Sequence, residues 1–213
     1  TVEKKIKNNT RLISIMHVNN ELGTINPINE IARISHEKGI LFHSDAVQAF
    51  GKIPIDVTNI PVDFLSMSAH KLYGPKGTGG LFIRNGATLE PLIYGGGQET
   101  NLRASTENIA GIGGFGMAVE LALKNLGKNL AHVNRLETHF LNQMDQKTID
   151  YKINGIKRIP GVFNITFPTI DGQNLVMHLD MAGIGISFGA ACASGTVKAS
   201  SLLLDIGLTE EQA

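Results

Sequence analysis

The sequence predicts an α/β fold in which a partial parallel-sheet large domain is followed by a small α+β domain. Three observations lead to this prediction: short apolar runs alternate with helical patterns, polar residues follow several of those runs, and the pattern changes near residue 147. Alternating strands and helices are typical of parallel βαβ units, whose functional loops gather at the carboxyl ends of the strands.

The first part of the chain contains short apolar runs rich in β-branched and aromatic residues, which favour strands. The expected strands are 12–16, 40–42, 64–68 and 79–83. Between the first two, Pro27 precedes a stripe of Ile28, Ile31 and Ile34 at helical spacing, and Gly39 ends it. Proline before the first turn and glycine after the last are the usual limits of a helix, so one is expected there.

A long helical pattern covers residues 106–146, with a break expected at Gly127, and it is interpreted as a helix that bridges two domains. After it the chain predicts strands at 151–154, 162–167 and 184–188, and helices at 173–181 and 201–206. We therefore expect residues 1–146 to be part of a large domain with its bridging helix. Residues 147–213 are expected to be part of a small C-terminal domain.

Composition excludes several classes of protein. The 213 residues hold 19 basic and 19 acidic side chains, so no net charge draws the chain to nucleic acid. No uninterrupted apolar run reaches the roughly 18 residues of a membrane span, and the single cysteine and the absence of a signal-like N-terminus indicate a cytoplasmic protein. Because the chain opens at Thr1 and ends soon after a capping box at Thr209, a fragment of a longer protein is expected.

Two glycine-rich segments resemble nucleotide-binding loops but lack their context. Gly111, Gly113 and Gly116 match G-x-G-x-x-G, yet no strand precedes them and they lie within helical periodicity. The segment 74–79 lacks the Gly-Lys-Ser/Thr ending of a phosphate loop. The seven histidines form no metal-binding motif, so no resident metal is expected.

Two polar residues at predicted strand ends point to cofactor chemistry. Lys71 follows the strand at 64–68, and a lysine in such a position can become a nucleophilic amine that forms a Schiff base. Asp45 follows the strand at 40–42, and a carboxylate beside a pyridine nitrogen keeps it protonated, as pyridoxal phosphate chemistry requires. Alone, Lys71 would be interpreted as an ordinary solvated lysine.

Four segments, taken in order, resemble successive motifs of the NifS/IscS-like cysteine desulfurases. They read MHVNNELG from Met16, HSDAVQ from His43, VDFLSMSAHKLYGPKG from Val62 and GGGQE from Gly95. Those enzymes belong to the class V aminotransferase group of pyridoxal 5'-phosphate (PLP) enzymes, which have fold type I. The resemblance implies a PLP-dependent enzyme that converts L-cysteine to L-alanine.

The resemblance also implies roles for individual residues around the cofactor ring. Lys71 would hold PLP as a Schiff base and move protons, and His70 would act beside it. Asp45 would pair with the pyridine nitrogen, and Gln48 would bond the phenolic oxygen of the ring. Asn20 would lie beside the ring.

The phosphate of the cofactor is assigned in the same way. Ser68 and His70 would hold it, and Thr106 matches a family threonine that reaches the phosphate of the neighbouring subunit, which implies a homodimer. Taken one by one, Asn20, Gln48 and Thr106 would be interpreted as turn or capping residues. Only their joint occurrence favours the cofactor role.

Cys192 is the second candidate catalytic residue. A lone cysteine is more often a small buried hydrophobe than a nucleophile, but this one lies in FGAACASGT, a run of small residues without apolar periodicity. The run resembles the persulfide loop of the family, although Ala190 stands where serine is usual and Ala199 where proline is common. Cys192 would pass sulfur to an acceptor or iron–sulfur scaffold protein and would ligate iron–sulfur only transiently.

Other interpretations remain open at this stage. Another class V enzyme, such as a selenocysteine lyase or a small-amino-acid transaminase, would need Lys71 and Asp45 but not Cys192. A non-catalytic fragment or interaction module would need none of them. The resemblance places a ring-stacking histidine and a substrate-binding arginine outside this chain, so weak or absent PLP binding and activity are expected of the isolated chain.

Overall fold

The computed structural model describes residues 1–187 and 200–210, and the chain forms two compact units. One unit combines Thr1–Val18 with Asn26–Leu130, and the other combines Asn19–Ile25 with Ala131–Ala213. The turn at 19–25 thus joins the second unit, although it lies early in the chain. The domain limits expected from the sequence, 1–146 and 147–213, stay a prediction.

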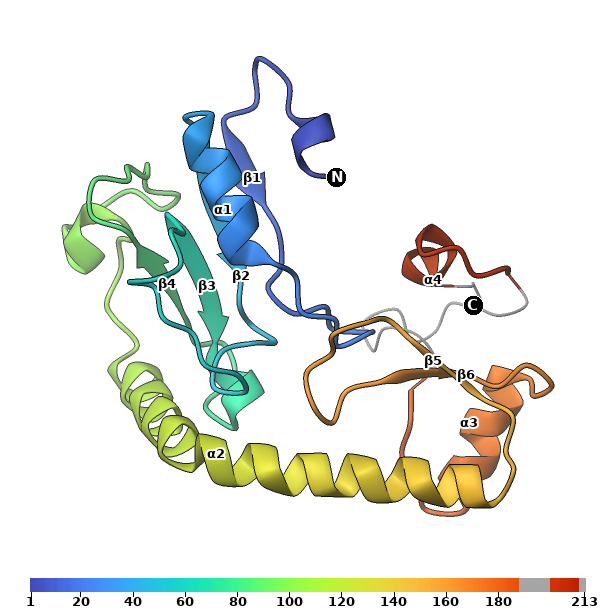
Figure 1. Cartoon of the computed structure of the whole chain (residues 1–213). Coiled ribbons are helices and arrows are strands. Elements are labelled where there is room, and N and C mark those ends of the chain that lie inside the picture. The colour runs from blue at the N-terminus through green and yellow to red at the C-terminus, as the bar shows by residue number, and fades with distance from the viewer. Residues whose placement is uncertain (188–199, 211–213) are drawn as a thin grey trace. The chain divides into compact units, whose positions relative to one another are not determined.

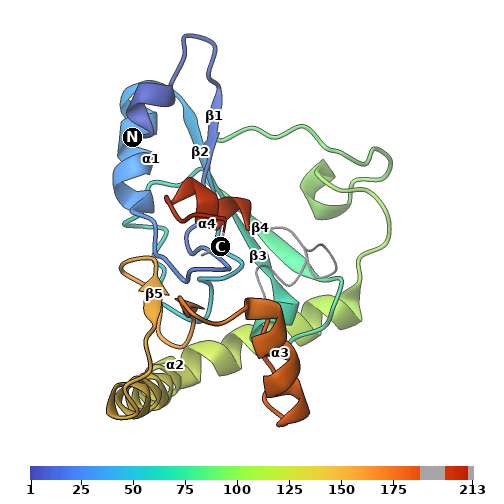
Figure 2. The same cartoon turned by 90° about the vertical axis from the view of Figure 1, so that its right-hand side faces the viewer.

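The first unit contains a four-stranded sheet in the order β1-β2-β3-β4 (Figures 1 and 2). Its strands are β1 (Leu12–Ser14), β2 (Leu41–Asp45), β3 (Phe64–Ser68) and β4 (Gly79–Ile83). All four expected strands are present, but β1 ends at Ser14 rather than at residue 16, and β2 continues to Asp45 rather than ending at residue 42. The first three run parallel, whereas β4 pairs with β3 in the antiparallel direction. The segment 69–78 between them is shorter than the dozen or so residues that a parallel crossover needs, so the chain turns back on itself.

Helix α1 (Ile28–Glu37) packs against β2 on one face of this sheet (Figure 1). Its apolar stripe is buried, and Ala32 is fully enclosed. Opposite it, Phe42 and Leu65 are the largest enclosed side chains of β2 and β3. Burial of this one stripe explains why the expected helix forms, because a ten-residue helix is marginal without tertiary packing.

Three short 3-10 helices lie in the loops of the first unit, namely η1 (Glu3–Lys5), η2 (Ala69–Leu72) and η3 (Gln98–Asn101). Helix η2 begins directly after β3 and carries two of the candidate site residues. It ends at Tyr73, whose φ of 63° lies in the left-handed region, and the Gly74 N–H then donates to the Ala69 carbonyl at 3.0 Å. The chain therefore reverses tightly just after Lys71.

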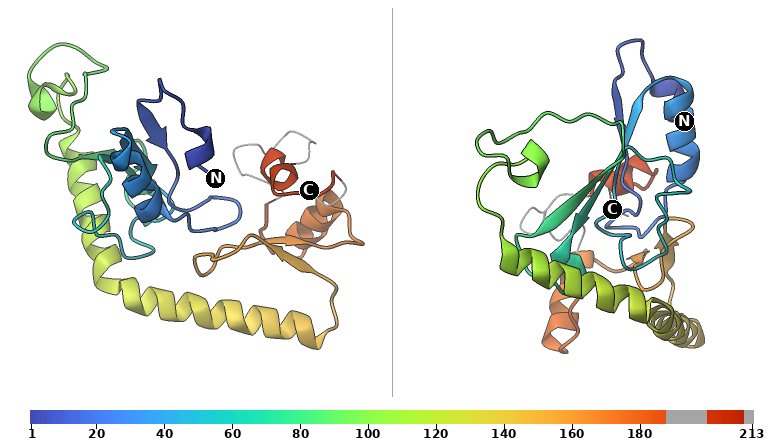
Figure 3. Two further views of the ribbon diagram at one scale, coloured as in Figure 1. Left: turned by 45° about the horizontal axis from the view of Figure 1, so that its top comes forward. Right: turned by 90° about the vertical axis from the view of Figure 1, so that its left-hand side faces the viewer.

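Helix α2 (Ile109–Gln146) is continuous over 38 residues, so the break expected at Gly127 is wrong. It bends in its amino-terminal half but does not end there (Figure 3). One exposed glycine costs a helix only about 1 kcal/mol, which a helix of this length tolerates. By length and composition α2 could cross a membrane, but the core helix of a soluble protein passes the same test, so this is weak evidence.

Gly111, Gly113 and Gly116 lie inside α2, as expected, and Gly111 together with the adjacent Gly114 allows the helix to approach the loop 74–78. A Cβ atom built on Gly114 would lie 2.6 Å from Pro75 Cγ, and one on Gly111 would lie closer still to Thr78 Oγ1. Both distances are far below van der Waals contact. The bare helix surface therefore supports the loop that follows η2.

The second unit contains a two-stranded antiparallel sheet of β5 (Lys152–Asn154) and β6 (Asn164–Thr166). Helices α3 (Gly172–Met181) and α4 (Ser201–Asp205) follow, and the Asp171 side chain caps α3. These four elements confirm the expected ones. Residues 184–187 form no strand, which contradicts that part of the strand expected at 184–188; residue 188 lies outside the described residues. The Ile184 N–H instead closes the end of α3 on the Leu179 carbonyl at 2.8 Å.

An ion pair joins α2 to the loop between β5 and β6 inside the second unit. Glu137 Oε1 accepts from Arg158 at 2.9 Å, and Glu137 Oε2 accepts from the Gly161 N–H at 2.7 Å. Phe140 stacks on Phe163 beside this pair, with ring centroids 5.5 Å apart. Both carboxylate oxygens of Glu137 thus accept hydrogen bonds from the loop between β5 and β6.

We predict opposite effects for two neighbouring glycine substitutions in α2. Gly114→Ala should destabilise the complete protein, because the added methyl group meets Pro75 and must displace the loop 74–78. Gly113→Ala, with nothing within 4 Å of its Cβ position, should be neutral or stabilising by up to about 1 kcal/mol. Denaturant unfolding measures both. Equal free energies of unfolding for the two variants would contradict the close packing of α2 on this loop.

Candidate active site

The parallel pairing of β2 and β3 brings two groups of candidate residues to one edge of the sheet. Asp45 ends β2 and lies in register with Ser66, two residues before β3 ends at Ser68. The Ala46 N–H continues the ladder by donating to the Ser66 carbonyl at 2.9 Å. Because both strands end here, Asp45 and the segment that carries Ser68, His70 and Lys71 follow neighbouring strands at the same edge.

Asp45 is half-buried, and both its side chain and its backbone carbonyl accept hydrogen bonds. Its Oδ1 atom accepts from the Val47 N–H at 2.8 Å, and its backbone carbonyl accepts from the His17 N–H at 2.8 Å. Within the part of the chain that the structure describes, no hydrogen bond reaches its Oδ2 atom. One carboxylate oxygen is therefore fixed by the backbone and the other is available to a ligand.

Next to Asp45, hydrogen bonds between side chains link three neighbouring strands. His43 Nδ1 lies 2.7 Å from Ser14 Oγ on β1, and His43 Nε2 lies 3.1 Å from Ser66 Oγ on β3. Burial lowers the pKa of His43, and the Asp45 carboxylate partly offsets this. A neutral imidazole suits the position, because it can donate to one serine and accept from the other.

The end of β3 places a hydroxyl, an imidazole and an amine on four consecutive residues. Ser68 Oγ lies 2.6 Å from His70 Nδ1, and both side chains belong to the turn that η2 makes. The Ala69 N–H donates to the Thr78 carbonyl at 3.0 Å, which ties this turn to the start of β4. His70 and Lys71 are both exposed, so they are accessible to a ligand.

Gln48 lies in the turns that follow Asp45. Its Oε1 atom accepts a hydrogen bond from Lys52 Nζ at 2.8 Å. Lys52 is half-buried, and its pKa is lowered first by burial and then by the charge of Lys71. The charge of Lys71, which follows β3, therefore acts on Lys52, which follows β2.

The remaining candidate residues are not joined to this edge by any described contact. Asn20 is exposed at the tip of a turn of the second unit, in which Asn19 Oδ1 accepts from the backbone of Glu21 and Leu22. Thr106 is exposed in the loop before α2. Cys192 lies outside the described residues. The roles of all three stay predictions.

Two polar residues close to candidate residues, His43 near Asp45 and Lys52 on Gln48, are absent from the site predicted from the sequence. His43 precedes Asp45 by two residues, and the period of a strand places both on one face, which was the available signal. Lys52 follows Gln48 by four residues, the spacing of a helical turn. Neither spacing identifies the serine or amide that each one binds. Among the described residues, no group of three or more His, Cys, Asp or Glu could hold a metal ion.

Comparisons with known proteins agree with the resemblance of the motifs. A family model described as aminotransferase class-V matches residues 1–206. The chain is 44% identical over 214 residues to "Cysteine desulfurase IscS" of Dictyoglomus turgidum, and 47% identical over 216 residues to the protein of that name from Clostridium botulinum strain Hall. Each alignment covers 100% of this chain and 54% of the relative. The chain thus spans about half the length of these relatives.

Solved structures give the same grouping. A NifS-like protein from Rickettsia africae ESF-5 matches with a TM-score of 0.85 at 33% identity, over 100% of this chain and 56% of that one. A second structure titled "NIFS-LIKE PROTEIN" matches with a TM-score of 0.81 at 39% identity, over 87% of this chain and 52% of that one. The fold class expected from the sequence is confirmed.

The buried histidine beside Asp45 predicts a dependence of stability on pH. His17 is 6% exposed, its Nδ1 atom has no partner among the described residues, and burial lowers its pKa from the ordinary value of 6.5. Above pH 6.5 the imidazole is neutral in both folded and unfolded states. Below it, the unfolded chain binds a proton that the folded chain does not, so stability falls by up to about 1.4 kcal/mol per pH unit until the folded pKa is passed.

Denaturant unfolding at pH 7.5 and 5.5 checks this. His17→Gln should lose less free energy of unfolding between the two pH values than the wild type does, because the titrating group is gone. His139→Gln, a change at an exposed histidine of α2, is the matched control and should keep the wild-type dependence. Identical pH dependence in all three proteins would show that His17 contributes nothing.

Proposed function

Because this chain belongs to the aminotransferase class-V family, we propose that the complete protein is a PLP-dependent cysteine desulfurase. It would convert L-cysteine to L-alanine and load Cys192 with a persulfide. The observation that carries the proposal is the position of Asp45 and the Ser68–Lys71 segment after two paired parallel strands. A ligand bound at that edge would have a carboxylate, an amine, a hydroxyl and an imidazole on two neighbouring strand ends.

The chemistry of the donor set fits pyridoxal 5'-phosphate. A carboxylate with one oxygen available suits a protonated pyridine nitrogen, and the hydroxyl and imidazole of Ser68 and His70 suit a phosphate. Lys71 supplies the amine through which this cofactor attaches to its enzymes. When bound, PLP supplies an electron sink for the carbon atom that bears the amino group of the substrate.

The residues of this chain would then divide the work. Asp45 would keep the pyridine nitrogen protonated, because an opposite charge within hydrogen-bond reach favours the charged form of each partner. Gln48 would donate to the phenolic oxygen, and Asn20 would lie beside the ring. Lys71 would carry protons to and from the substrate, with His70 as a neighbouring proton donor or acceptor.

Cys192 would act on the sulfur atom of the substrate. Its thiolate attacks that sulfur, a sulfur–sulfur bond forms, and the carbon–sulfur bond of the substrate breaks. The electron pair of the broken bond stays on carbon, which takes up a proton and leaves as alanine. Cysteine plus the Cys192 thiol thus gives alanine plus the Cys192 persulfide, with atoms and electrons balanced.

The partners of the complete protein follow from the same proposal. Thr106 would reach the phosphate bound by a second copy of the chain, so the enzyme would be a homodimer with shared sites. The Cys192 persulfide would pass its sulfur to an acceptor or iron–sulfur scaffold protein, in the cytoplasm. Iron–sulfur ligation by Cys192 would be transient, and nucleic acid and membrane would have no part in the reaction.

The Cys192→Ser variant of the complete protein tests the reaction. It should bind PLP and keep the absorbance of the bound cofactor, because Lys71 and the phosphate-binding residues are unchanged. Formation of alanine from cysteine should fall by at least about a thousandfold, since a hydroxyl group cannot accept sulfur. Single-turnover assays with detection of alanine measure this. Alanine formation at the wild-type rate would exclude the desulfurase mechanism and favour another class V reaction.

A further inference from the structure

Lys52 lies in the turns that follow β2, and neither the motifs nor the comparisons give it a role. Its side chain returns toward Gln48 within the turns that follow β2, where the Phe50 N–H donates to the Ala46 carbonyl at 2.7 Å and the Lys52 N–H to the Ala49 carbonyl at 3.0 Å. These turns set residues four apart on one side of the segment. Lys52 Nζ and Gln48 Oε1 meet there at 2.8 Å.

The chemistry of this hydrogen bond fixes the orientation of the Gln48 amide. A lysine ammonium has three donor hydrogens and no acceptor, so the amide atom that faces it must be the oxygen. The nitrogen of the same amide is then directed away from Lys52. Gln48 therefore presents two N–H donors, and not a carbonyl oxygen, to whatever binds on its other side.

The surroundings of Lys52 keep its ammonium group on Gln48. Lys52 is half-buried, so it loses part of its hydration and depends more on protein acceptors. Burial, and after it the charge of Lys71, lowers the pKa of Lys52. The hydrogen bond to Gln48 Oε1 is what holds the Lys52 side chain in this arrangement.

We propose that Lys52 is a positioning residue, which holds Gln48 Oε1 so that the Gln48 N–H groups face the phenolic oxygen of PLP. The proposal rests on the proposed function, and it adds that Lys52 influences the affinity and the absorbance of bound PLP. Two N–H donors match an oxygen that accepts, as the ionised phenolic oxygen does. A freely rotating Gln48 could present its own oxygen instead, which would repel that anion.

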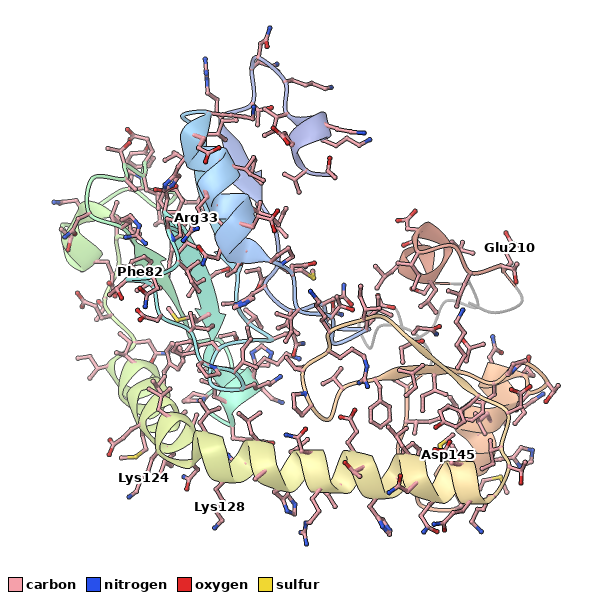
Figure 4. The ribbon with its side chains drawn as sticks, in the orientation of Figure 1. Arg33, Phe82, Lys124, Lys128, Asp145 and Glu210 are labelled. Carbon is pink, nitrogen blue, oxygen red and sulfur yellow. The ribbon has the colours of Figure 1, made fainter. Side chains whose placement is uncertain are left out.

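Equilibrium binding of PLP to the complete apoprotein tests the proposal without reference to turnover. Lys52→Met removes the donor at nearly constant length and should weaken PLP binding by about tenfold, the loss expected for one hydrogen bond to a charged group. The pH midpoint of the visible absorbance of bound PLP should also rise, because a nearby positive charge and an ordered donor to the phenolic oxygen are both lost. Lys124→Met is the matched control, since Lys124 is exposed and its side chain points outward from α2 (Figure 4).

Gln48→Met, alone and combined with Lys52→Met, shows whether Lys52 acts through Gln48. If it does, Lys52→Met should weaken PLP binding by less than about twofold in the Gln48→Met background, because coupled residues are not additive. A full tenfold loss in that background would overturn the proposal. So would wild-type affinity and an unchanged absorbance midpoint in Lys52→Met.

Two further outcomes separate the role of Lys52 from the PLP-dependent function of the protein. Failure of the wild-type protein to bind PLP would overturn both, whereas normal wild-type binding with no effect of Lys52→Met would overturn only the role of Lys52. If Lys52→Met does not fold, as judged by circular dichroism, Lys52→Arg replaces it. Arginine also donates without accepting, so its PLP affinity should stay within about threefold of the wild type, and a tenfold loss would overturn the proposal.

Discussion

The parallel pairing of β2 with β3 determines where the candidate site residues of the first unit lie. Asp45 and Ser66 face each other in that ladder, so the two strands end within two residues of each other. A shift of the register by one residue would turn Asp45 and His43 to the opposite face of the sheet. The buried face of β2, which contains Phe42 under α1, prevents such a shift, so the apolar core fixes the position of the acidic group.

A second layer of contacts supports the ends of these strands. Ser14, His43 and Ser66 link β1, β2 and β3 through side chains, and Lys52 holds the amide of Gln48. The glycine face of α2 packs on the loop after Lys71. Each of these contacts holds a segment that lies next to a candidate site residue.

Much of the fold could be predicted from the sequence, because the core strands are short apolar runs with polar ends. The strands 64–68 and 79–83 agree with β3 and β4 residue for residue. The break at Gly127 was wrong because propensity at one position does not outweigh a long helix. Of the strand expected at 184–188, residues 184–187 form no strand, because strand formation depends on a pairing partner and pairing is not encoded locally.

The site was predictable where it depends on strand ends and less so where it depends on side-chain partners. Asp45 and Lys71 were noticed because they follow apolar runs, whereas Ser68 entered through the resemblance of the motifs, and the roles of all three stay predictions. The bond from Lys52 to Gln48 depends on how the backbone turns between them, and the bonds of His43 depend on its neighbouring strands. The roles of Asn20, Thr106 and Cys192 stay predictions, because no described contact joins Asn20 or Thr106 to the ends of β2 and β3 and Cys192 lies outside the described residues.

The most direct measurement is the identity of the residue that holds PLP. Borohydride reduction of the PLP-loaded complete protein fixes the cofactor to its lysine, and peptide mass spectrometry then locates the modified residue. We predict that the label lies on Lys71, since it follows β3 beside the residues suited to bind the phosphate. A label on Lys52 or on any other lysine, with Lys71 unmodified, would contradict the site proposed at the ends of β2 and β3.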